Sequence, residues 1–255
     1  MGKLLRRYDE GMVRKLFEDE GVFAALGQRG FHDFVVGIEE GTGLPHTRLS
    51  AEKEGRRWLL LDASIVESSV PAEFFRQRGY GMKRPVSLAL LYWLREEDPT
   101  TAFTPDRPPL PLQRHPGLGV LRRAFKVIIT IARGCDLDGV ACVPKFFHDA
   151  AIFYRSRLFL FLDPAEEGRF ESLLRDAGSL PLSAAFALLS AGAVQDNAGS
   201  AVRWNPGLQV FPISPTLTAY FHSPQYADCV QATCGRSHFI WPATPPIDDS
   251  PLRAS

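Results

Sequence analysis

The spacing of hydrophobic and polar residues changes along the chain from the period of a helix to that of a strand. From residue 3 to about residue 26, apolar residues recur at helical spacing among Arg, Lys, Asp and Glu, which predicts an amphipathic helical region with a break near Gly11 or Gly21. Residues 31–39 and 56–68 carry β-branched and aliphatic runs between turn residues. This pattern predicts two strands that pair antiparallel.

The most continuous apolar segment is residues 85–96. Such a segment is typical of a strand covered on both faces, and we expect it at the centre of the sheet with Tyr92 and Trp93 in the core. Residues 98–116 follow and are rich in proline. Their fixed φ angles and missing N–H donors predict a surface loop.

Beyond this loop the pattern alternates between helix and strand. We expect a helix, a short buried strand, a second helix and another strand, at residues 118–132, 139–144, 145–158 and 158–163. Two further helices and a hairpin follow, at residues 166–177, 182–191, and 193–195 with 203–213. The order predicts an α/β domain over residues 1–164, a C-terminal helix-plus-hairpin appendage over residues 165–241, and a disordered tail over residues 242–255.

Composition and charge limit the classes of function. The chain has 255 residues, of which 45% are hydrophobic, and its 29 basic residues balance 29 acidic ones. A neutral chain has no overall field to attract nucleic acid or an anionic membrane, so we expect neither partner. No apolar run reaches the ~20 residues of a membrane-spanning helix, and the basic N-terminus lacks a secretory pattern, which predicts a cytoplasmic protein. The cysteines lack metal-ligand spacing and predict no metal site.

Candidate chemistry lies where the proline-rich loop meets the next helix. The sequence Arg114-His115-Pro116-Gly117-Leu118-Gly119 opens that helix, and Arg122 lies in its first turns. Glycines let a ligand approach the backbone closely, and the unpaired N–H groups and positive dipole end of a helix N-terminus favour an anion. Arg122 is also explained as part of the solvated face of an amphipathic helix. The residues expected to bind phosphate are Arg114, Gly117, Leu118, Gly119, Val120 and Arg122.

This spacing of a basic residue, two other residues, Gly, one residue and Gly resembles the characteristic motif of the GNAT superfamily of N-acyltransferases. In that family the backbone N–H groups of the loop bind the pyrophosphate of acyl-coenzyme A. The resemblance spans residues 85–164 and implies an α/β fold with a mixed, mostly antiparallel central sheet flanked by helices. It also implies acetyl-CoA or another acyl-CoA as co-substrate, a small-molecule or protein amine as acceptor, and a homodimer as a candidate assembly.

The same resemblance assigns candidate catalytic residues. Residues 150–154, Ala-Ala-Ile-Phe-Tyr, match the segment in which the family often places a general acid at the tyrosine. Tyr154 would protonate the departing thiolate of coenzyme A, although a role as a core aromatic residue explains it as well. The base for the amine would be Glu96 or another member of the acidic cluster Glu96-Glu97-Asp98, or Glu67, or a water relay.

Departures from the family pattern leave other functions open. Phe147 stands where relatives usually carry Asn, and Leu158-Phe159 stands where they carry Gly-Phe. The first hypothesis is an acyl-CoA-dependent N-acyltransferase in which an amine attacks the thioester directly. The alternative is a catalytically silent CoA-binding or regulatory module. A Rossmann-type nucleotide-binding enzyme comes third, because the full Gly-x-Gly-x-x-Gly pattern fails at Arg122.

Overall fold

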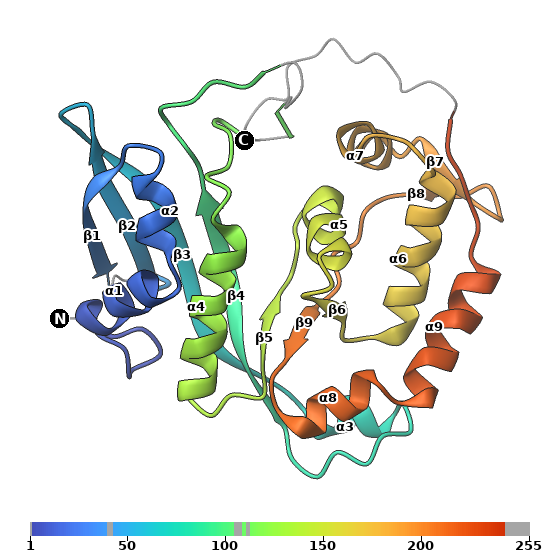
Figure 1. Ribbon diagram of the computed structural model, residues 1–255. Coiled ribbons are helices and arrows are strands. Elements are labelled where there is room, and N and C mark those ends of the chain that lie inside the picture. The colour runs from blue at the N-terminus through green and yellow to red at the C-terminus, as the bar shows by residue number, and fades with distance from the viewer. Residues whose placement is uncertain (1, 40–42, 105–108, 111–112, 243–255) are drawn as a thin grey trace.

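The computed structural model of the chain describes residues 2–39, 43–104, 109–110 and 113–242 (Figure 1). The predicted tail, apart from residue 242, and part of the proline-rich loop lie outside these residues. The helices are α1 (Glu10–Asp19), α2 (Val22–Gly27), α3 (Ala72–Arg76), α4 (Leu121–Gly134), α5 (Phe147–Arg155), α6 (Pro164–Ala177), α7 (Leu182–Ala191), α8 (Pro215–Phe221) and α9 (Pro224–Arg236). The strands are β1 (His32–Glu39), β2 (His46–Lys53), β3 (Arg56–Val70), β4 (Val86–Glu96), β5 (Gly139–Cys142), β6 (Leu160–Phe161), β7 (Val194–Asp196), β8 (Ala201–Val202), β9 (Gln209–Pro212) and β10 (Phe239–Ile240).

Seven strands form the main sheet in the order β1-β2-β3-β4-β5-β9-β6. Among the described strands of this sheet, β4 and β5 make the one parallel pair, and all other neighbours run antiparallel. The expectation of a mixed, mostly antiparallel sheet flanked by helices is confirmed. The Rossmann alternative requires a largely parallel sheet, and this strand order does not provide one.

Strand β4 lies at the centre of the sheet, as its continuous apolar pattern predicts. Val86 and Leu88 belong to a core cluster that includes residues of α3, α8 and α9, whereas Ala89 and Leu91 belong to a second cluster with α1, α2 and α4. Successive side chains of a strand point to opposite faces, so an apolar strand needs cover on both sides. In Figure 1, α1, α2 and α4 lie over one face, and α3 and α8 lie at the bottom of the view.

Two local predictions at the N-terminal end have different outcomes. The helical region divides at Gly21, as expected, because this residue has a φ of 69° that favours glycine. The predicted direct pairing of residues 31–39 with 56–68 is wrong, because β2 lies between β1 and β3. In β2 the buried side chains alternate with polar ones, and few are β-branched or aromatic, so its sequence carries a weak strand signal.

The C-terminal hairpin also differs from its prediction. Strands β7 and β8 pair antiparallel in a small sheet with β10, which confirms a hairpin in this region. The segment expected to continue it, however, contains β9, and β9 lies in the main sheet between β5 and β6. The main sheet therefore continues across the expected boundary between residues 164 and 165. Helices α6 and α9 pack side by side (Figure 1).

Close approach of β5 and β9 gives a first prediction. A Cβ atom on Gly139 would lie 2.7 Å from the carbonyl oxygen of Phe211, on the neighbouring strand. We expect Gly139→Ala to lower the free energy of unfolding by about 1–3 kcal/mol, because the strands must separate to admit the methyl group. Gly37→Ala on β1 is the control, since a Cβ there meets nothing within 4 Å. Urea denaturation measures both, and equal stability of the two variants would contradict the prediction.

Candidate functional site

The candidate site begins where strand β4 ends and helix α4 starts. The N–H of Asp98 donates to the carbonyl oxygen of Pro116 at 2.7 Å, which brings the two ends of the proline-rich loop together. The N–H of Val120 donates to Oε1 of Glu96 at 2.9 Å. The segment from Gly117 to Val120, which we call the cradle, is therefore held against the last residue of β4.

The cradle holds a carboxylate of the protein itself. Burial raises the pKa of Glu96, while the hydrogen bond from Val120, the charge of Arg29 and the N–H groups of Gly119 and Leu118 oppose this rise. Val120 is the N-cap residue of α4, and Leu118 and Gly119 directly precede it, so these N–H groups converge at a helix N-terminus and suit an anion such as a phosphate. The residue predicted to act as a base thus lies on the groups predicted to bind the cofactor.

Arg29 is a part of this site that the sequence did not reveal. It follows α2, and its Nη1 atom lies 3.6 Å from Oδ2 of Asp98. Gly119 has a φ of 70°, and a Cβ atom there would lie 3.1 Å from Nη2 of Arg29. The residue lies far from the cradle in the chain and in no recognisable motif, so only the fold brings it to this place.

A cleft of about 330 Å³ lies next to the cradle, between α4 and the end of α5. Its lining is an apolar floor with a cation on each helix: Leu121, Arg122, Phe125, Ile152, Phe153, Arg155, Ser156 and Leu158. Arg122 was among the predicted residues, whereas Arg155 was not. Arg114, the other predicted cation, is exposed in the segment that leads into the cradle.

Strand β4 extends beyond its pairing with β5. Their parallel pairing runs only from Leu88 with Gly139 to Leu91 with Cys142. Beyond it, the pairing of β4 with β3 shifts register, so that Tyr92 is an extra residue in a β-bulge. The expectation that Tyr92 and Trp93 are core residues is wrong, because they are 66% and 50% exposed. Both lie in the part of β4 beyond its pairing with β5. Val143, directly after β5, is also 50% exposed.

Three titratable groups lie where β5 leads into α5. Burial lowers the pKa of His148 to about 4, raises that of Asp149 to about 6, and raises that of the Cys142 thiol. His148 Nε2 lies 3.4 Å from Oδ1 of Asp149, while its Nδ1 atom is buried without a hydrogen-bond partner in the described residues. Asp149 is not among the residues predicted from the sequence, although it follows a buried strand at the start of a helix, which was the available signal.

Tyr154 faces α6. Its hydroxyl donates to Glu171 at 2.5 Å and lies 3.3 Å from Glu167, and its ring packs against Phe161 and Phe170. Burial and the two carboxylates raise the pKa of this phenol. Its chain neighbours line the cleft, but Tyr154 is not among the lining residues. These contacts give it a structural role, and its role as a general acid stays a prediction.

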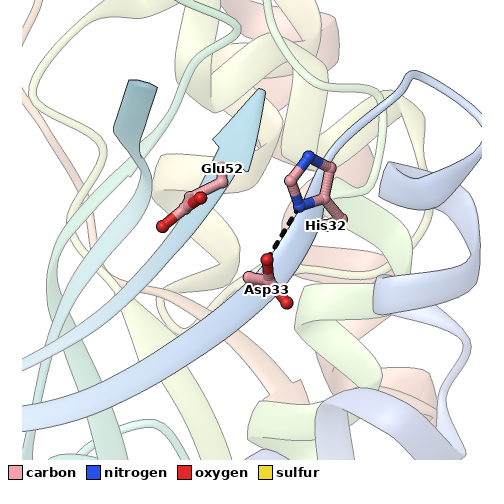
Figure 2. A group of neighbouring side chains, drawn as sticks. All are labelled: His32, Asp33 and Glu52. Carbon is pink, nitrogen blue, oxygen red and sulfur yellow. Dashed lines mark hydrogen bonds and ion pairs between the residues drawn. The ribbon is translucent and has the colours of Figure 1, made fainter. Parts of the chain in front are cut away.

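Glu67 and a surface cluster lie away from the cradle. Glu67 is exposed on β3. Burial raises the pKa of Cys135, which caps the C-terminal end of α4 away from the cradle, and the charge of Glu67 adds to this rise. Figure 2 shows His32, Asp33 and Glu52, whose candidate ligand atoms lie within 4.8 Å of one another. These side chains are exposed or half-buried, and Arg57 donates to Glu52 at 2.7 Å. The ion pair already neutralises part of the negative charge, so we assign no metal to this group.

No protein-family model and no curated protein matches the chain. Among solved structures, the chain is similar to "AtaT complexed with acetyl-methionyl-tRNAfMet", with 15% sequence identity and a TM-score of 0.30. The alignment covers 62% of this chain and 80% of that chain. This degree of similarity assigns neither a family nor an activity. That structure contains a tRNA, and the expectation that this chain has no nucleic-acid partner stays a prediction.

In the described part of the chain, no helix has the length and apolar character needed to cross a membrane.

The contacts of Tyr154 give a second prediction. Tyr154→Phe removes the donor to Glu171 and leaves that carboxylate beside Glu167, so we expect the free energy of unfolding to fall by about 1–2 kcal/mol. Tyr92→Phe is the control, because its side chain is exposed, and it should change stability by less than about 0.5 kcal/mol. Chemical denaturation measures both variants. A Tyr154→Phe protein as stable as wild type would show that the hydroxyl does not link α5 to α6.

Asp149 gives a third prediction, on pH. A folded-state pKa of about 6 lies above the ordinary value of 3.8, so the contribution of Asp149 to stability is present at low pH and is lost as pH rises through 6. We expect Asp149→Asn to be more stable than wild type above this pH and the difference to shrink below it. Thermal unfolding across the pH range measures the difference. A difference in stability that stays constant across the pH range would contradict the prediction.

Proposed function

We propose that the chain is an acyl-CoA-dependent N-acyltransferase. The observation that supports this most directly is the cradle, whose N–H groups converge on a carboxylate at the N-terminus of α4. The adjoining cleft combines an apolar floor with Arg122 and Arg155. Acyl-CoA has the matching chemistry, because it joins several phosphate charges to an adenine ring and an uncharged arm.

In this proposal each part of the site binds one part of the co-substrate. The N–H groups of Gly117 to Val120 donate to the pyrophosphate, which requires Glu96 to leave them. Arg114, Arg122 and Arg155 supply positive charge to the phosphates. The apolar floor of the cleft, formed by residues such as Phe125 and Phe153, packs against the uncharged portion.

The transfer itself would take place where β4 extends beyond its pairing with β5. The co-substrate supplies an acyl thioester, and the exposed Tyr92 and Trp93 offer a surface for the acceptor at the end of the parallel pair. The amine nitrogen attacks the carbonyl carbon, a C–N bond forms, the C–S bond breaks, and the thiolate takes up a proton. We propose direct attack, because burial and a raised pKa keep the thiol of Cys142 protonated.

The proton of the amine needs an acceptor. In the observed position Glu96 accepts from the cradle, so we assign the role of base to Asp149, whose pKa of about 6 suits a base near neutral pH. Tyr154 remains the predicted donor to the thiolate, and its hydrogen bond to Glu171 must open for that role. These roles predict loss of transfer without loss of CoA binding when the residues are replaced.

The same observations support a second candidate function, a silent CoA-binding or regulatory module. Glu96 occupies the cradle, and Tyr154 is engaged with α6. Binding of CoA without acyl transfer to any amine would favour this alternative.

Binding of CoA by calorimetry tests the proposed site and gives a fourth prediction. We expect Arg122→Ala and Arg155→Ala each to weaken CoA binding by about tenfold, which corresponds to about 1.4 kcal/mol. Arg133→Ala is the control, because Arg133 is an exposed arginine in the last turn of the same helix. It should bind CoA as wild type does. No binding of CoA by the wild-type protein, or equal loss in all three variants, would contradict the proposal.

Release of free thiol from acetyl-CoA in the presence of a panel of amines then decides between the two functions. The transferase hypothesis expects release that depends on an amine and is lost in Asp149→Asn. Bound CoA with no release from any amine or acyl-CoA would establish the silent module instead.

A further inference from the structure

The cradle is occupied from within the protein. Glu96 is the last residue of β4, and its carboxylate accepts the N–H of Val120 at 2.9 Å. The N–H groups of Gly119 and Leu118 also favour its ionised form. Hydrogen bonds of this kind, between backbone N–H groups and a carboxylate, are stronger than those between neutral groups. An internal anion therefore holds the donors on which the proposed function relies.

Two anions cannot use the same donors at the same time. We propose that Glu96 gates the cradle: its side chain occupies the N–H groups of residues 118–120 in the free protein and must be displaced before the phosphates of the co-substrate bind. This inference rests on the proposed function, because it takes CoA as the ligand of the cradle. It assigns Glu96 to the control of binding and not to proton transfer from the acceptor.

Backbone hydrogen bonds hold the main chain around Glu96 in place, so the part that moves in the proposed gate is the side chain of Glu96. Glu96 pairs with Leu61 of β3, and the N–H of Glu97 donates to the carbonyl oxygen of Leu60 at 3.2 Å. On the other side, Pro116 accepts from the N–H of Asp98. Rotation of the Glu96 side chain can therefore vacate the cradle while strand and helix stay in place.

Charged groups around the gate come from several elements. The positive charge of Arg29, which follows α2, favours the ionised form of Glu96. Its Nη1 atom lies 3.6 Å from Oδ2 of Asp98. The positive charge of Lys53, at the end of β2, favours the ionised form of Asp98, and its Nζ atom donates to Oγ1 of Thr100 at 2.9 Å. Hydrogen bonds from Thr100 keep the pKa of Asp98 below its usual range although burial opposes this. Asp98 therefore stays ionised over the pH range in which Glu96 titrates.

The gate should respond to pH. Burial raises the pKa of Glu96, so its carboxyl takes up a proton at a higher pH than an exposed glutamate does. The neutral carboxyl has a weaker hold on the N–H groups than the ionised one. Displacement of Glu96 by phosphate should become easier as pH falls through this pKa.

The test, and the fifth prediction, is calorimetric titration with CoA of wild type, Glu96→Gln, Glu96→Ala and the control Glu97→Gln. At about pH 8, where a glutamate is ionised, we expect both Glu96 variants to bind CoA about tenfold more tightly than wild type. The advantage should shrink as pH is lowered, because wild-type Glu96 takes up a proton at a higher pH than an exposed glutamate does. Glu97→Gln should match wild type throughout. Titration of the phosphates of CoA affects every protein alike and cancels in the ratio.

A second readout needs no ligand. In the free wild-type protein, the amide resonance of Val120 should shift with the titration of Glu96, and this shift should be absent in Glu96→Gln. Thermal unfolding of each variant confirms that it is folded, and Glu96→Gln retains the shape of the side chain if Glu96→Ala does not fold.

The outcomes separate the gate from the proposed function. CoA binding of equal strength and equal pH dependence in wild type and Glu96→Gln would overturn the gate and leave the proposed function intact. No CoA binding by any of the proteins, with the Val120 shift still present, would overturn the proposed function and with it the role of Glu96 as a gate for CoA. Weaker binding in the Glu96 variants would show that the carboxylate supports the cradle, which contradicts the gate.

Discussion

The hydrogen bond between Glu96 and Val120 joins the two elements on which the site depends. Strand β4 and helix α4 are separated in the chain by a proline-rich loop, whose six prolines lack a backbone N–H. The N–H of Val120, the N-cap residue of α4, has no partner within the helix, and the carboxylate at the end of β4 accepts it. Together with the backbone hydrogen bond from Asp98 to Pro116, this contact holds the helix start against the strand end, and it places a negative charge at the positive end of the helix dipole.

The parallel pairing of β4 with β5 determines where the cradle lies in the sheet. A parallel connection needs a crossover, and α4 supplies it, so the cradle lies at the end of the sheet where both strands end. The pairing stops at Leu91, opposite Cys142 at the end of β5, and the bulge at Tyr92 follows directly in β4. Tyr92 and Trp93 are exposed in this part of β4, so an accessible aromatic surface lies on the strand that leads to the cradle.

The sequence predicted what depends on pattern within one segment. Strand β4, helix α4 and the cradle all follow from local apolar spacing and from glycine and helix-start chemistry. It did not predict what depends on the rotation of a helix: Tyr154 faces α6 while its chain neighbours Phe153 and Arg155 line the cleft. It also missed Arg29 and the placement of β9, because a distant cation and a four-residue strand acquire their roles only from the fold.

A chain with equal numbers of acidic and basic residues must create an anion site locally. Buried N–H groups without partners are costly, so an internal carboxylate stabilises the free protein at the same donors that a phosphate would use. A glutamate brings one negative charge to the cradle, whereas a pyrophosphate brings more charge and can also reach Arg122 and Arg155 across the cleft. In the proposed function, selectivity would arise from this difference: a ligand with a single carboxylate would gain little by displacing Glu96, while one with several phosphate charges would gain contacts with the arginines of the cleft.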